Sequence, residues 1–240
     1  MNKTTLETEG RTCVLMAESD PCCLMIQPVD MRDLDSLEQE YGLIRQLCGT
    51  DTALAAFSVS DWNCDLSPWD AEAVFGGRSF GHGAGETLNF LQESLVPRVL
   101  SELSAGDSLP LILGGYSLAG LFALWAAYEF GSFAAVSAVS PSVWFPGWLD
   151  YAKTRRPKAG YIYLSLGTKE EKTRNRTMAA VGDCIRAQHE LLGPQRSTLE
   201  WNEGNHFTDP SLRCAKGFAW CVKQLKMPGS LPGSDTEQIK

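Results

Sequence analysis

The chain has 240 residues, a formal net charge of −8, a hydrophobic content of 44% and a charged content of 21%. These values are typical of a globular protein with a sizeable apolar core. The acidic balance argues against nucleic acids and anionic membrane surfaces as partners, because both attract basic patches. No apolar run has the length of a membrane span, and the first residues, MNKTTLETEG, lack the apolar core of a secretory signal.

The predicted strands and helices alternate along the chain. The predicted strands cover residues 11–18, 22–29, 52–59, 111–113, 133–140, 160–166 and 197–202. The predicted helices cover residues 35–48, 86–103 with a kink at Pro97, 118–130, 148–155, 175–192 and 210–225. This order predicts an α/β fold, with a mostly parallel sheet of about seven strands and helices on both faces. Sites in such sheets lie at the carboxyl ends of the strands.

Residues 1–228 are predicted to form a single domain, since no linker divides them and no insertion is large enough for a cap domain. Residues 229–240 are rich in Pro, Gly and Ser and are predicted to be a flexible tail. Residues 60–85 have no clear period, and loops of that length are usually functional.

The eight cysteines form no CxxC pair and no zinc-ligand spacing. Most of them lie in apolar runs, where a free thiol behaves as a small hydrophobic group. So many thiols without a disulfide framework are unusual in an oxidising compartment. We therefore expect reduced cysteines, a cytoplasmic location and no bound metal.

Residues 110–131 read PLILGGYSLAGLFALWAAYEFG, which indicates a buried strand, a sharp turn and a helix. Ser117 lies at the apex of the turn. Gly115 and Ala119 are small, as they must be where the strand and the helix cross closely. Ala119 replaces the glycine of the strict G-x-S-x-G pattern, a change of one methyl group. The stretch predicts the nucleophile elbow of an α/β-hydrolase fold, with Ser117 as the nucleophile.

A serine nucleophile needs a histidine base and an acid that orients it, and in this fold they follow in the order Ser, acid, His. His82 precedes the predicted elbow, and His189 lies in the middle of a predicted helix. His206 follows the last predicted strand, so it is the candidate base.

The oxyanion hole is predicted to use two backbone N–H groups, one of them from Leu118, directly after the nucleophile. The second donor is expected in the loop QPVDM. Pro28 has no N–H, which leaves Val29, Asp30 or Met31, and we favour Val29.

Four segments resemble an esterase branch of the α/β-hydrolases, which includes the esterase D-like enzymes and the siderophore esterases. They are GYSLAGL at 115–121, SPSVW at 140–144, GTKE at 167–170 and GNH at 204–206, with weaker matches at QPVD and DLSPW. The resemblance implies hydrolysis of a carboxylic ester through an acyl-enzyme, without a cofactor, and a small-molecule substrate. It leaves the substrate and the oligomeric state open.

The triad acid is expected in the loop GTKEEKTRNR after the strand at 160–166. The residues themselves select neither Glu170 nor Glu171, and Asp150 is a third candidate after the preceding strand. The G-x-x-E pattern of the resembling family selects Glu170.

The predicted substrate pocket includes Trp62, Trp144, Tyr116 and Arg78, because aromatic and convergent polar groups commonly line ligand sites. An anionic ferric siderophore would need cations to hold it, whereas this chain is acidic. Two other functions stay open: an acyltransferase or thioesterase with the same triad, and a non-catalytic binding protein with this fold.

Overall fold

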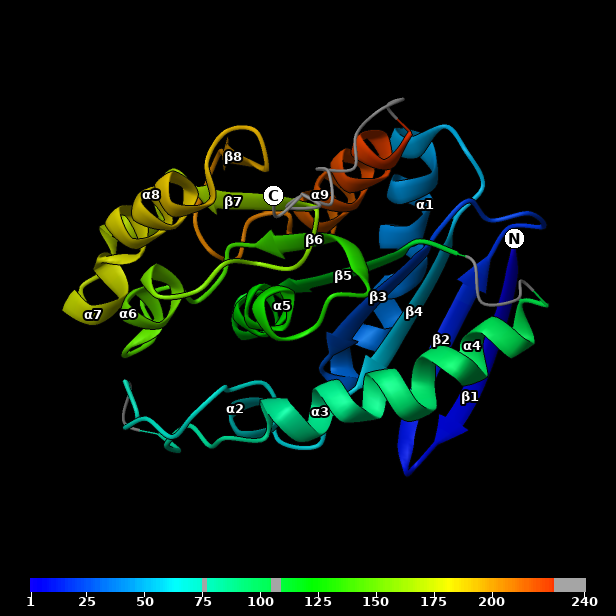
Figure 1. Ribbon diagram of the computed structural model, residues 1–240, viewed down its shortest axis with the longest axis horizontal. Helices are drawn as coiled ribbons and strands as arrows, with labels where there is room; N and C mark the ends of the chain where they lie inside the picture. Colours follow the sequence, from blue (N-terminus) through cyan, green and yellow to red (C-terminus); the bar gives the residue numbers. More distant parts are fainter. Residues whose placement is uncertain (75–76, 105–108, 227–240) are drawn as a thin grey trace, which may run out of the picture.

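The computed structural model describes residues 1–74, 77–104 and 109–226. These residues form an eight-stranded sheet in the order β1-β2-β4-β3-β5-β6-β7-β8 (Figure 1). The strands are β1 (Asn2–Thr8), β2 (Arg11–Ala17), β3 (Leu24–Val29), β4 (Ala53–Ser58), β5 (Leu111–Tyr116), β6 (Phe133–Val139), β7 (Tyr161–Gly167) and β8 (Ser197–Asn202). The pairs from β4 through β8 are parallel, so the carboxyl ends of these strands meet at one edge.

The sheet has eight strands, whereas about seven were predicted. The additional strand is β1, which was not predicted because its sequence has no alternating hydrophobic pattern. Leu6 is its one buried residue, since β1 pairs only with β2, antiparallel, at the edge of the sheet. Glu9 and Gly10 both have positive φ angles, of 50° and 74°, in the two-residue turn that joins β1 to β2. Such a turn matches the twist of a hairpin.

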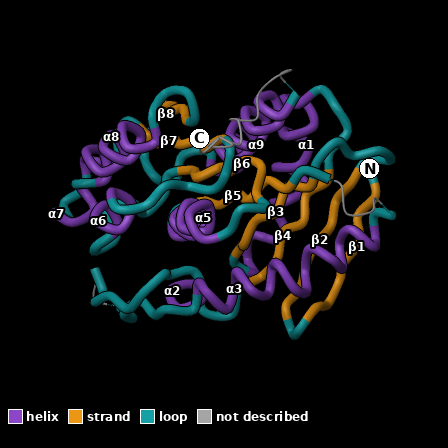
Figure 2. Tube along the Cα trace, viewed as in Figure 1, coloured by secondary structure: helices purple, strands orange, loops and turns teal. Residues whose placement is uncertain are grey.

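Helices cover both faces of the sheet, as predicted. They are α1 (Leu37–Cys48), α2 (Trp62–Asp65), α3 (Ala84–Phe90), α4 (Val96–Glu102), α5 (Leu118–Glu129), α6 (Trp148–Lys153), α7 (Arg176–Ala179), α8 (Val181–Leu192) and α9 (Pro210–Leu225). α1 and α9 lie side by side on one face, where they bury one apolar core, and α3, α5 and α8 bury a second core on the other face (Figures 1 and 2).

Two predicted helices are interrupted. A π-helical turn over Leu91–Leu95 separates α3 from α4, and Pro97 lies in the first turn of α4. Proline has no N–H to donate, and a local change of helix type is one way for a helix to accommodate it. The predicted helix over 175–192 is divided into α7 and α8.

The long segment over 60–85 contains α2 and an isolated bridge between Ala71 and Phe80. Much of it is loop, shown in teal beside α2 in Figure 2. The predicted tail, residues 229–240, lies outside the described residues. Within the described part of the chain, no helix is both long enough and apolar enough to cross a membrane.

Candidate active site

Ser117 lies between the end of β5 and the start of α5, with φ 60° and ψ −120°. A non-glycine residue rarely has a positive φ, and such strain is common where a side chain must be presented in one direction. A Cβ atom on Gly115 would lie 2.3 Å from the carbonyl oxygen of Ala119, so this position requires glycine. The N–H of Ser117 donates to the oxygen of Val139 (3.0 Å), and its carbonyl accepts from the N–H of Ser142 (3.0 Å). The turn is therefore fixed by both neighbouring segments.

A chain of hydrogen bonds joins Ser117, His206 and Glu170. The Oγ of Ser117 lies 3.0 Å from Nε2 of His206, and Nδ1 of His206 lies 2.7 Å from Oε2 of Glu170. Ser117 follows β5, Glu170 follows β7, and His206 follows β8. The parallel strands bring together three residues that are far apart in the sequence.

The second oxygen of Glu170 accepts three more hydrogen bonds. They come from the N–H of Gly167 (2.7 Å), the Oγ of Ser140 (2.8 Å) and Nη1 of Arg213 (2.9 Å). Burial raises the pKa of Glu170, but the bonds from His206, Gly167 and Ser140 lower it by more. Its pKa is therefore below the ordinary value, and the carboxylate stays charged.

Arg213 connects this carboxylate to the loop that carries His206. It projects from α9, is 2% exposed, and donates from Nη2 to the carbonyl oxygens of Glu203 and Asn205, both at 3.0 Å. The hydroxyl of Tyr116 also donates to the carbonyl of His206 (2.5 Å). The histidine loop is thus held from two sides.

The sequence analysis missed the part that Arg213 and Ser140 play around Glu170. Arg213 is a charged residue on the buried face of α9, among Cys214, Gly217 and Phe218. An arginine on an apolar helix face indicates a buried carboxylate partner. Ser140 begins the SPSVW segment that resembles the esterase branch, but nothing in that segment indicates a contact with Glu170.

The other two candidate acids lie away from His206. Glu171 forms an ion pair with Arg186 (3.2 Å), and Asp150 forms one with Lys153 (3.3 Å) on the surface of α6. Neither carboxylate contacts the imidazole.

The two predicted backbone donors also lie beside Ser117. Leu118 is the first residue of α5, and an N–H in the first turn of a helix has no partner within the helix. Val29 ends β3 and lines a cavity of about 510 Å³ together with Ser117 and His206. Leu118 is therefore placed to present its N–H to a group bound at Ser117.

The N–H of Val29 is not available to such a group, because the parallel pairing of β3 with β4 requires it to donate to the carbonyl of Phe57 within the sheet. The expectation of Val29 as the second donor is therefore wrong, which leaves Asp30 and Met31.

Two cavities meet at Ser117 and His206. The larger, of about 820 Å³, is lined by Trp62, Trp144 and Arg78, three of the predicted pocket residues. The smaller, of about 510 Å³, is lined by Tyr116, the fourth, and again by Trp62. Phe207, which the sequence analysis did not single out, lines both and is 86% exposed.

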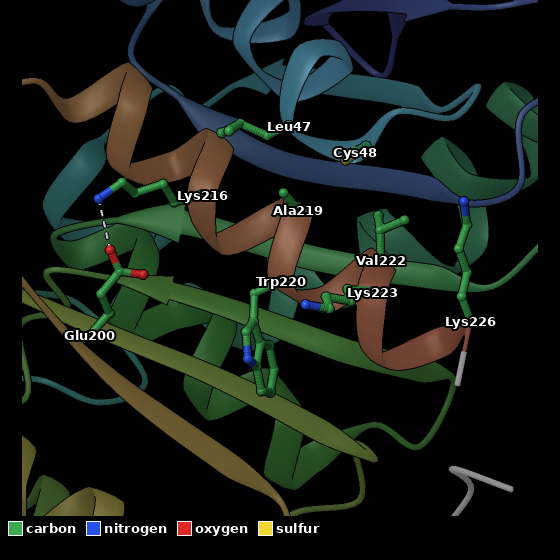
Figure 3. Close-up of a pocket in the computed structure, with 9 residues that line it drawn as sticks. All are labelled: Leu47, Cys48, Glu200, Lys216, Ala219, Trp220, Val222, Lys223 and Lys226. Carbon is green, nitrogen blue, oxygen red and sulfur yellow. Dashed lines mark hydrogen bonds and ion pairs between the residues drawn. The ribbon is translucent and has the colours of Figure 1, made fainter. Parts of the chain in front are cut away.

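A third hollow lies elsewhere, between α1 and α9 (Figure 3). It has a volume of about 340 Å³, and Leu47, Trp220 and Lys223 line it. An ion pair between Lys216 and Glu200 (2.8 Å) closes one side. None of the predicted site residues lines this hollow. Within the described residues, no three His, Cys, Asp or Glu side chains are grouped to hold a metal ion.

Several solved structures have the same fold, and each match covers almost the whole of this chain. An IroE-like serine hydrolase from Shewanella oneidensis has a TM-score of 0.75 and 15% identity, over 94% of this chain and 82% of that one. The siderophore hydrolase EstB from Aspergillus nidulans has a TM-score of 0.74 and 18% identity, over 95% and 96%. The enterobactin esterase FES from Shigella flexneri has a TM-score of 0.65 and 16% identity, over 93% and 59%. No curated protein matches the sequence.

The family model described as "Putative esterase" matches residues 57–201, more than half of the chain, including Ser117 and Glu170. The eight-stranded, mostly parallel sheet agrees with the fold of the solved structures. The chain therefore belongs to this esterase family and is an ester hydrolase with an α/β-hydrolase fold.

Proposed function

We propose that this protein is a serine hydrolase that cleaves a carboxylic ester through an acyl-enzyme, with Ser117, His206 and Glu170 as its catalytic triad. The observation that carries the proposal is the chain of two hydrogen bonds, 3.0 Å from Ser117 to His206 and 2.7 Å from His206 to Glu170. A serine hydroxyl becomes a nucleophile only when a base takes its proton, and this geometry provides one.

In the first half of the reaction, the Oγ of Ser117 attacks the ester carbonyl while Nε2 of His206 accepts the hydroxyl proton. The N–H of Leu118 donates to the negative oxygen that forms, together with a backbone N–H of Asp30 or Met31. The C–O bond to the alcohol then breaks, and His206 gives its proton to the departing alkoxide. In the second half, water repeats the attack on the acyl-enzyme with His206 as base, which releases the acid and restores Ser117.

Glu170 has a positioning role in this scheme. Its carboxylate accepts a hydrogen bond from the Nδ1–H of His206, so Nε2 carries no proton and can accept the proton of Ser117. The same negative charge stabilises the imidazolium that forms during attack. The lowered pKa of Glu170 keeps that charge in place.

The larger cavity favours an ester with an aromatic or anionic part. Trp62 and Trp144 offer apolar rings, while Arg78, Lys169 and Lys172 add positive charge. Two of the neighbours are named as siderophore hydrolase and enterobactin esterase, so an anionic siderophore ester is a candidate substrate. Transfer of the acyl group to an acceptor other than water would use the same triad, and product analysis separates the two reactions.

We also propose a cytoplasmic location and a single domain over residues 1–228. The eight cysteines are all free thiols, as expected of a reducing compartment. One sheet incorporates strands from Asn2 to Asn202, which supports one folding unit.

The proposal is tested by replacing Ser117 with alanine and measuring kcat/KM on p-nitrophenyl esters of increasing acyl length. We expect a loss of about 10⁴-fold or more, because the nucleophile is absent. Ser101→Ala, an exposed serine on α4, is the matched control and should hydrolyse the esters as the wild type does. Hydrolysis that survives Ser117→Ala would contradict the proposal.

A further inference from the structure

The smaller cavity contains a buried carboxyl group that the proposed reaction does not use. Glu40 projects from α1, is 6% exposed and lines this cavity together with Ser117 and His206. Its Oε1 accepts a hydrogen bond from Nε2 of Gln27 (2.7 Å). Its Oε2 accepts none from any residue that the structure describes. A buried carboxyl with an unused oxygen beside a cavity can receive a donor from a ligand.

The other charges around this cavity are also mainly acidic. Asp30 and Asp33 line it, and Arg32 is the one Lys or Arg side chain among its lining residues. Arg32 is already paired with Asp30, at 2.9 Å. Arg32 also lies near Asp33, whereas Glu40 has no cation beside it in the cavity lining. The larger cavity differs, since Lys169 and Lys172 line it in addition to Arg78, which is paired with Asp61 (3.4 Å).

We propose that the smaller cavity binds an ammonium group on the ester substrate, with Glu40 as the specificity-determining residue. The inference rests on the proposed function, because it concerns the same hydrolytic site. An ammonium has three donors and a positive charge, so it can satisfy the free oxygen of Glu40 and offset the acidic lining. A neutral hydroxyl would satisfy the oxygen alone. The substrate is thus an ester whose amine-bearing part occupies the smaller cavity while its other part occupies the larger one.

Matched esters test this inference, because a methyl group can replace the ammonium without a large change of shape. One pair, methyl 6-aminohexanoate and methyl heptanoate, carries the group on the acyl side. The other pair, 6-aminohexyl butyrate and heptyl butyrate, carries it on the alcohol side. Hydrolysis of each ester is measured by pH-stat titration. In at least one pair, the wild type should have a kcat/KM about tenfold or more higher for the amine-bearing ester than for its methyl counterpart. The pair that shows the preference identifies the side of the ester that enters the smaller cavity.

In assays at pH 8, above the pKa of about 7 that burial gives Glu40, Glu40→Gln should remove most of this preference, since the amide keeps the shape and loses the charge. Glu38→Gln is the matched control: Glu38 lies on the same helix but is exposed and paired with Lys3 (2.6 Å), so the preference should remain. Wild type alone provides a second measurement that does not depend on a buried variant folding. Pentylammonium should inhibit it competitively at about tenfold lower concentration than pentanol.

Equal hydrolysis within both pairs, or equal inhibition by pentylammonium and pentanol, would overturn the ammonium site while leaving the proposed function intact. A preference that survives in folded Glu40→Gln would overturn the role of Glu40. Failure of the wild type to hydrolyse any of the four esters or any p-nitrophenyl ester would instead count against the proposed function.

Discussion

Glu170 and Glu40 are both buried beside the same serine, but their surroundings favour opposite charge states. Glu170 is 8% exposed and Glu40 is 6% exposed. Burial raises the pKa of each, yet the donors around Glu170 bring its pKa below the ordinary value. Glu40 has one neutral donor, Gln27, so burial prevails and raises its pKa to about 7. The donors around Glu170 therefore outweigh the effect of burial on its pKa, whereas the single neutral donor at Glu40 does not.

Among changes at the two glutamates, the largest effect is expected when the charge at Glu170 is removed. Glu170→Gln should lower kcat by about 10³–10⁴-fold, because an amide favours the wrong tautomer of His206. Glu171→Gln and Asp150→Asn are the matched controls and should change kcat little, since neither side chain contacts His206. Steady-state kinetics on one p-nitrophenyl ester compares all three variants. If Glu171→Gln or Asp150→Asn abolished activity while Glu170→Gln kept it, the acid would be misassigned.

Removing the cation beside Glu170 should make that site resemble the surroundings of Glu40. Arg213→Met leaves a buried carboxylate without its guanidinium partner, which lies 2.9 Å away. Loss of one partner of a buried ion pair costs about 3–5 kcal/mol of unfolding free energy. Urea denaturation measures this cost. Arg186→Met, which breaks the more exposed pair with Glu171, should cost about 1 kcal/mol or less. Equal losses in the two variants would contradict the account of Arg213.

The two carboxyls should also give opposite pH dependences of stability. The pKa of Glu40 rises from 4.5 to about 7 on folding, so the folded state holds a proton that the unfolded chain releases. Its contribution to stability is fully present below pH 4.5 and is lost as the pH rises through about 7. Relative to Glu40→Gln, the wild type should lose about 3 kcal/mol of unfolding free energy over that range.

Glu170 has the opposite sign, since its pKa is lowered on folding. Its contribution is present above the unfolded pKa and is lost as the pH falls through the lower, folded value. Relative to Glu170→Gln, the wild type should therefore lose stability in acid. Urea denaturation from about pH 2 to about pH 8 follows both comparisons, because the Glu170 window lies below pH 4.5. Parallel stability curves for wild type and Glu40→Gln would show that Glu40 does not hold its proton.

The fold was predictable because alternating buried strands and helices leave a strong pattern, and the structure confirms a mostly parallel α/β sheet. The strand β1 was not predictable, because an edge strand with one buried residue has no apolar face to reveal it. Ser117 and His206 could be proposed from local turn chemistry and chain order. Glu170 could be chosen over its neighbour Glu171 only through the family resemblance.

The hydrogen-bond partners of the two glutamates could not be predicted from the sequence. Arg213 reaches Glu170 from α9, and Gln27 reaches Glu40 from β3. These contacts depend on how the helices pack against the sheet, and a local sequence pattern does not specify such long-range packing. The same limit applies to the second cavity and its acidic lining.

The central claim, that Ser117 is the nucleophile, is tested most directly by covalent labelling with a fluorophosphonate. Intact-protein mass spectrometry should show one adduct on the wild type, and peptide mapping should locate it at Ser117. Ser117→Ala should take up no label, while Ser101→Ala should be labelled as the wild type is. A folded Ser117→Ala that is labelled as fully as the wild type, or a wild type labelled at Ser140 or Ser142, would contradict the account.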